Sequence, residues 1–147
     1  MKNILVAIDS FETTTVASPL IEKTIEMAKA FSSRVWVLHV APPSRQHPFN
    51  VDRQILRREV SHELHDEHEF VQQFSQCLRD REVDAKSLLV EGTTINTILH
   101  ESERLEIDLI IMGCRRHGEL FGALVNETDE GMLAKCTHPI MFVPVLE

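Results

Sequence analysis

Apolar residues gather in short, nearly continuous runs that alternate with longer segments of helical spacing. The runs are Ile4–Ile8, Val35–Val40, Ser87–Val90, Leu109–Met112 and Ile140–Val145. Short runs rich in Val, Ile and Leu are typical of parallel strands that helices cover on both sides. The alternation therefore predicts an α/β fold: a doubly wound, five-stranded, mostly parallel sheet with helices on both faces.

The segments between the runs predict helices of different lengths and one loop. Residues 17–31 keep a helical period, and Pro19 suits the first helical position. Residues 51–82 are highly charged and carry one apolar stripe, which predicts a long helix with one buried side. The Gly-Thr-Thr of 92–94 is predicted to cap a shorter helix. Three prolines within 41–48 predict a loop instead.

Composition favours one soluble domain over 1–147. The chain has 147 residues, of which 43% are apolar, and this fits a single core. Its 23 acidic and 15 basic residues give a net charge of −8, which disfavours nucleic acid and anionic membrane surfaces as partners. The sequence has neither an apolar run of membrane-spanning length nor a signal peptide, so we expect a cytoplasmic protein. Its 3 cysteines are widely spaced, which argues against a disulfide framework or a zinc knuckle.

Candidate chemistry lies where the strands end. If the first strand is central, the ends of the first, second and fourth strands bring Asp9, Val40 and Met112-Gly113 to one crevice. Ligands of parallel α/β sheets bind beyond the carboxyl ends of the strands, and a glycine there lets backbone N–H groups approach an anion. Arg115 and Arg116 follow directly and could attract phosphate.

These residues resemble the universal stress protein family. Ala7-Ile8-Asp9 is similar to the Val-Asp or Ile-Asp that ends the family's first strand, and Leu38-His39-Val40 to the Leu-His-Val that closes its second. Asp108–Gly113 resembles the family's Asp-Leu-Ile-Val-Met-Gly, and Cys136–Val143 its last segment, where a proline introduces the final strand. The resemblance covers the whole chain and implies an adenine nucleotide alpha-hydrolase-like, Rossmann-like fold.

The resemblance also implies where a nucleotide would bind, and the sequence departs from that pattern. ATP-binding members carry Gly-x2-Gly-x9-Gly-Ser/Thr around the ribose and phosphates. Here the first glycine is Gly113, but Arg116, Asn126 and Glu127 stand at the other three positions. A carboxylate in place of the hydroxyl opposes phosphate: at about 5 Å and an effective dielectric near 20, one pair of like charges costs roughly 3 kcal/mol.

Two interpretations of this segment compete. Asn126 and the acids after it suit a helix start, where side-chain carboxylates favoured by the macrodipole would take the place of phosphate. The positions that contact the base or ribose in the family, here Asp9, Val40 and Met112, are less altered, which leaves AMP or adenosine binding open. Val40 and Met112 suit the core equally well. The candidate nucleotide residues are Asp9, Val40, Met112, Gly113, Arg115, Arg116, Asn126 and Glu127.

Two further signals are weaker. His62, His65 and His68 recur every three residues among acids, so a pair of them could share a helix face and bind a transition metal. Such a run is more often the solvated side of a long helix. Cys114 lies beside two arginines, which could lower the pKa of its thiol, but no family mechanism supports catalysis there.

The leading hypothesis is a non-catalytic regulatory or interaction module in stress adaptation, without tight ATP binding. The family pairs through its last strand, so the resemblance implies a homodimer through Ile140–Val145, and Pro144 is tolerated on such an edge. An adenine nucleotide sensor or slow ATPase is the main alternative, and a metal-binding protein the second. The sequence does not name the protein partner.

Overall fold

The computed structural model describes residues 1–8, 19–41, 69, 71–92, 94–114 and 135–144, and every structural statement below concerns these residues. They contain five strands and two complete helices. The strands are β1 (Asn3–Ile8), β2 (Arg34–Ala41), β3 (Ala85–Glu91), β4 (Leu109–Cys114) and β5 (Ile140–Pro144). The helices are α1 (Pro19–Phe31) and α3 (Thr94–Arg104), and residues 71–80 are also helical.

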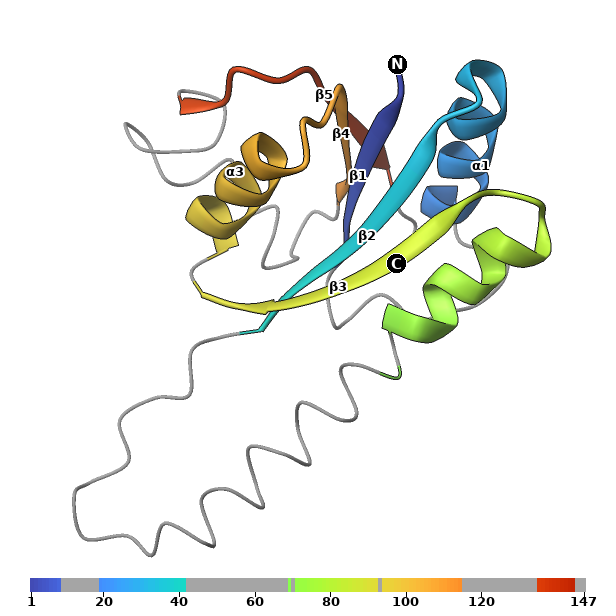
Figure 1. Ribbon diagram of the computed structural model, residues 1–147, viewed down its shortest axis with the longest axis horizontal. Coiled ribbons are helices and arrows are strands. Elements are labelled where there is room, and N and C mark those ends of the chain that lie inside the picture. The colour runs from blue at the N-terminus through green and yellow to red at the C-terminus, as the bar shows by residue number, and fades with distance from the viewer. Residues whose placement is uncertain (9–18, 42–68, 70, 93, 115–134, 145–147) are drawn as a thin grey trace, which may run out of the picture.

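The strands form one sheet in the order β3-β2-β1-β4-β5 (Figure 1). Each neighbouring pair is parallel, with Ile4 of β1 opposite Val35 of β2 and Leu109 of β4. The first strand is therefore central, which is the condition under which the ends of the first, second and fourth strands meet. The sequence predicted both this sheet and the place of the last strand at its edge, and both predictions are confirmed within the described residues.

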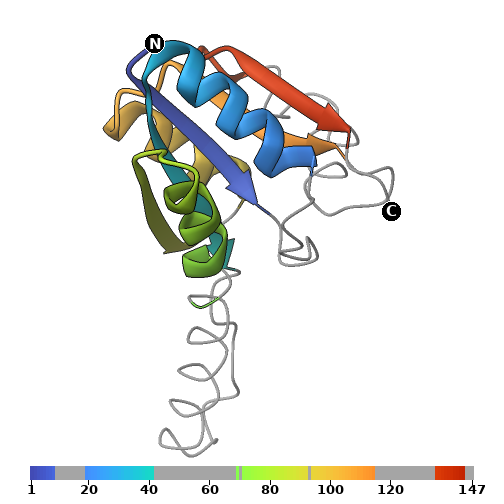
Figure 2. The same cartoon turned by 90° about the vertical axis from the view of Figure 1, so that its right-hand side faces the viewer.

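Helices cover both faces of the sheet (Figure 2). On one face, α1 and residues 71–80 pack on alternate strand residues, and Ile21, Phe74 and Val37 belong to this core. On the other face, α3 packs on the remaining residues, and Leu5 and Ile98 belong to that core. Because helices bury both faces, the central strands β2, β1 and β4 are apolar over most of their length, which is why their sequences form nearly continuous apolar runs.

Element boundaries differ from expectation by small amounts. β3 begins two residues before the predicted run, at Ala85, because Ala85 and the polar Lys86 still pair with β2. α1 begins at Pro19, as predicted. Of the long helix predicted over 51–82, residues 71–80 are helical with Phe74 and Leu78 buried, and 51–68 lie outside the described part. The proline loop also lies outside it, from residue 42 onward.

Helices end in the same way before β2, β3 and β4. Ser32, Glu82 and Glu106 have positive φ values of 52°, 65° and 53°. In each case the next residue donates its N–H to the carbonyl five residues earlier, as Ser33 does to Ala28 at 2.9 Å. Val83 to Leu78 (3.1 Å) and Ile107 to Ser102 (2.9 Å) repeat the pattern. This is the Schellman motif, here made three times without the glycine that usually occupies the left-handed position.

Candidate functional site

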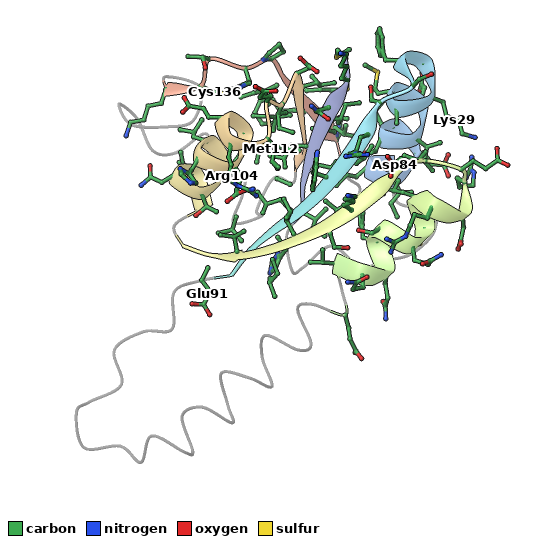
Figure 3. All side chains as sticks on the ribbon, viewed as in Figure 1. Lys29, Asp84, Glu91, Arg104, Met112 and Cys136 are labelled. Carbon is green, nitrogen blue, oxygen red and sulfur yellow. The ribbon has the colours of Figure 1, made fainter. Side chains whose placement is uncertain are left out.

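The carboxyl ends of β2, β1 and β4 lie side by side in the sheet. The β1–β2 pairing runs to Ile8 opposite His39, and the β1–β4 pairing to Ala7 opposite Met112. We call the ends of these strands, at Ile8, Ala41 and Cys114, the carboxyl edge. The predicted adjacency of the three strand ends is therefore confirmed. Of the last residues of the five described strands, Glu91 of β3 is the only charged one, and it is exposed at the carboxyl ends (Figure 3).

Three of the candidate nucleotide residues lie within the described part. Val40 is half-buried and packs against the core on the α3 side of the sheet. The side chain of Met112 is fully buried in the same core, and Gly113 is a buried strand residue opposite Val143 of β5. The other candidates lie outside the described residues: Asp9, Arg115, Arg116, Asn126 and Glu127.

His39 ties the end of β2 to the end of β1. Its side chain is only 4% exposed, and its Nδ1 lies 3.1 Å from the carbonyl oxygen of Ile8. A carbonyl oxygen only accepts, so Nδ1 carries the proton and donates. In the sequence His39 stands within a family-like motif, and its hydrogen bond to Ile8 was not predicted. Its signal is a polar residue inside an otherwise apolar strand.

Asp108 begins the family-like motif of β4 but acts at the opposite end of the sheet. Its carboxylate accepts hydrogen bonds from the backbone N–H groups of Asn3 at 3.0 Å and Lys2 at 2.8 Å. These two bonds hold the pKa of the Asp108 carboxyl below its usual value, against a smaller opposing effect of desolvation. Asp108 therefore joins the start of β1 to the start of β4 and is remote from the carboxyl edge.

The segment before β5 is also fixed by local hydrogen bonds. The Cys136 thiol donates to the carbonyl of His138 at 3.3 Å, and its sulfur accepts the N–H of the same residue at 3.4 Å. Pro139 then accepts a 2.9 Å hydrogen bond from the N–H of Ile110, which joins the start of β5 to β4. Cys136 and Cys77 are both free thiols. The family-like segment that begins at Cys136 thus sets the turn into the edge strand.

The connection from β3 into α3 is tightly packed at the carboxyl edge. A Cβ atom added to Gly92 would overlap the Oγ1 atom of Thr97, a nearly buried residue of α3. Only a residue without a side chain fits there while Thr97 keeps its rotamer. The Gly-Thr-Thr pattern led us to predict a helix cap here. The close approach to Thr97 shows that Gly92 also has a packing role in this connection.

A cavity of about 440 Å³ opens at the other end of the sheet. Ala28, Lys29, Ser32 and Ser33 line one side and residues 82–84 the other, and Lys29 and Asp84 lie near each other there (Figure 3). Asp84 accepts a 2.9 Å hydrogen bond from the Nε of Arg34. The cavity lies before the first residues of β2 and β3, so it is separate from the carboxyl edge where parallel sheets take ligands.

The described part of the chain has neither a metal-binding cluster nor a membrane-spanning helix. His62, His65 and His68 lie outside it, and the described residues contain no group of three His, Cys, Asp or Glu side chains placed to hold a metal ion. Among the described helices, none is long and apolar enough to cross a membrane.

The sheet order and the helices on both faces define a doubly wound α/β protein of the Rossmann-like type. The profile of the universal stress protein family matches residues 1–144, and the chain belongs to this family. No curated protein matches the sequence.

Solved structures of the same fold cover nearly the whole chain. A universal stress protein from Lactobacillus plantarum is 19% identical, covers 97% of this chain and 97% of its own, and has a TM-score of 0.70. One from Archaeoglobus fulgidus in complex with dAMP is 14% identical, with 97% and 98% covered and a TM-score of 0.64. One from Arabidopsis thaliana with AMP bound is 14% identical, with 98% and 92% covered and a TM-score of 0.63.

Proposed function

We propose that this universal stress protein is a non-catalytic regulatory or interaction module whose carboxyl edge does not bind ATP tightly. The observation that carries the proposal is the sequence that follows Gly113. Gly113 ends a buried stretch of β4 beside β1, the place from which the family's phosphate-binding motif continues. In this chain the motif continues with Arg116, Asn126 and Glu127 instead of two glycines and a hydroxyl.

Charge supports this proposal. A carboxylate within about 5 Å of a phosphate costs roughly 3 kcal/mol at an effective dielectric near 20, which is about a hundredfold in affinity. Glu91, the charged residue at which β3 ends, adds a negative charge at the carboxyl ends of the strands. The net charge of −8 disfavours a polyanion further.

The test restores the family's motif. Calorimetric titration with Mg-ATP is expected to give no saturable heat for the natural chain. The variant Arg116→Gly/Asn126→Gly/Glu127→Ser is expected to gain at least about a hundredfold in affinity. Asp129→Ser in the natural background is the matched control, because it removes one negative charge two residues beyond Glu127 without restoring the motif. Tight ATP binding by the natural chain, or phosphate release from ATP above the buffer rate, would contradict the proposal.

A second candidate function is sensing of an adenine monophosphate. It is favoured by the neighbours of the same fold that were solved with AMP, dAMP and cAMP. A monophosphate carries fewer charges toward Glu127 than ATP does, so the same repulsion costs it less. Saturable heat with AMP, abolished by a bulky replacement such as Val40→Trp, would support this candidate, and its absence would remove it.

We also propose that the protein is a homodimer through β5. Ile140, Met141 and Phe142 are each half-buried on this last strand of the described sheet, so their apolar surface is only partly covered. An exposed edge strand of this kind is protected when it pairs with a second copy. Light scattering is expected to give a dimer, and Met141→Lys a monomer. Phe31→Lys, which changes an apolar residue that is 47% exposed on α1, is the control and should leave the dimer intact.

A further inference from the structure

His39 differs from the other residues of the strands that meet at the carboxyl edge. It lies inside the sheet, 4% exposed, on the face covered by α1, where its strand neighbours Val35 and Val37 are apolar core residues. A polar side chain in such a position costs free energy unless it makes a hydrogen bond. Its Nδ1–H makes one to the carbonyl of Ile8, at 3.1 Å. A buried aliphatic residue would fill this space without that bond.

The acceptor is at a special point of the sheet. Ile8 is the last residue of β1 and is 2% exposed. The pairing of β1 with β4 reaches only Ala7 opposite Met112, so Ile8 lies one residue past it. Where a strand ends, a buried carbonyl can lack a hydrogen-bond partner on the neighbouring strand. A side-chain donor can then take the place of that partner.

We propose that His39 is a positioning residue of the candidate site, and that it acts through the Ile8 carbonyl. By holding that carbonyl, His39 fixes the last peptide of β1 and so the point from which the chain continues to Asp9, the next residue in the sequence and a candidate nucleotide residue. The significance of this role rests on the proposed function, because it concerns the same edge. The hydrogen bond itself can be tested without any nucleotide.

Three substitutions separate the hydrogen bond from the volume of the ring. In His39→Asn the side-chain amide occupies the position of Nδ1, so the donor is kept. His39→Gln moves the donor one bond further from the backbone, and His39→Leu removes it while keeping an apolar filler. Thr24→Val is the control: Thr24 is fully buried and donates to the Leu20 carbonyl at 2.7 Å within α1, away from the edge.

The readout is amide hydrogen exchange resolved by NMR at the end of β1 and in β4, together with thermal unfolding. We expect His39→Leu to speed exchange at the amides of Ala7 and Ile8 by about tenfold, the effect of one hydrogen bond, with β4 unchanged. His39→Asn should restore the protection even though its smaller side chain lowers the melting temperature. Thr24→Val should lower the melting temperature without selective exchange at β1.

Two results would overturn the proposal. One is exchange in His39→Leu that rises equally across β1 and β4, in step with the melting temperature. The other is protection from amide exchange at the end of β1 that follows the volume of the side chain at position 39. The His39→Leu and His39→Gln variants would then be better protected than His39→Asn. Whether the natural chain binds AMP or ATP tests only the proposed function, because this exchange experiment is done without ligand.

Discussion

Glycine at the three left-handed helix ends should make the protein more stable. Ser32, Glu82 and Glu106 hold φ values of 52° to 65°, a region that costs a residue with a Cβ atom on the order of 1 to 2 kcal/mol. All three side chains are exposed, so their removal sacrifices little buried surface. Against this gain, glycine loses about 0.5 to 1 kcal/mol through the greater freedom of the unfolded chain. Each substitution should therefore add roughly 0.5 to 1 kcal/mol.

The triple variant Ser32→Gly/Glu82→Gly/Glu106→Gly should gain about 2 kcal/mol, because the sites lie at separate helix ends and should be nearly additive. For 147 residues at about 2.1 cal/mol/K each, the unfolding entropy is near 0.3 kcal/mol/K, so the melting temperature should rise by about 6 °C. Differential scanning calorimetry measures this directly.

A matched control places the same glycine in helical backbone. Glu103→Gly, in the last turns of α3, should lower the melting temperature by about 3 °C, because it adds flexibility without relieving any positive φ. If the triple variant melts at or below the temperature of the natural chain while Glu103→Gly behaves as expected, the reasoning about the left-handed positions is wrong.

Further predictions concern the two ends of the sheet. The pKa of Asp108 is lowered by its two backbone donors, so its contribution to stability is complete above its ordinary pKa of 3.8 and is lost as the pH falls through the lower pKa of the folded state. Asp108→Ala should cost about 1 kcal/mol in urea unfolding at pH 7, and the difference from the natural chain should shrink in strong acid; an undiminished difference there would refute this reading. Gly92→Ala should cost about 1 kcal/mol through its clash with Thr97, and Thr97→Ala in the same chain should recover most of it. Equal losses in the single Gly92→Ala variant and the double variant would show that the clash is not the cause.

The fold could be predicted from the sequence because its signals are local and repeated. Continuous apolar runs mark strands that helices bury on both sides, and α1 begins at Pro19, where a proline suits the first helical turn. The adjacency of β2, β1 and β4 followed from assuming that the first strand is central, and the sheet order confirms that assumption.

The contacts that fix the strand ends could not be predicted in the same way. Asp108 reaches the backbone of residues more than a hundred positions away, and His39 meets a carbonyl of another strand, so neither bond has a local pattern. The left-handed residues that follow the helices were not predicted for a different reason: Ser32, Glu82 and Glu106 occupy positions where glycine is the usual signal. The phosphate side of the candidate site stays a prediction, because Arg115, Arg116, Asn126 and Glu127 lie outside the described residues.

The most direct test of the central claim is calorimetric titration of the natural protein with ATP and, in parallel, with AMP, after removal of any copurified nucleotide. We expect no saturable heat with ATP at concentrations up to about 1 mM, which corresponds to a binding free energy weaker than about 4 kcal/mol. Saturable ATP binding at micromolar concentration would contradict this claim, because Glu127 would then be compatible with the phosphates that it is proposed to repel.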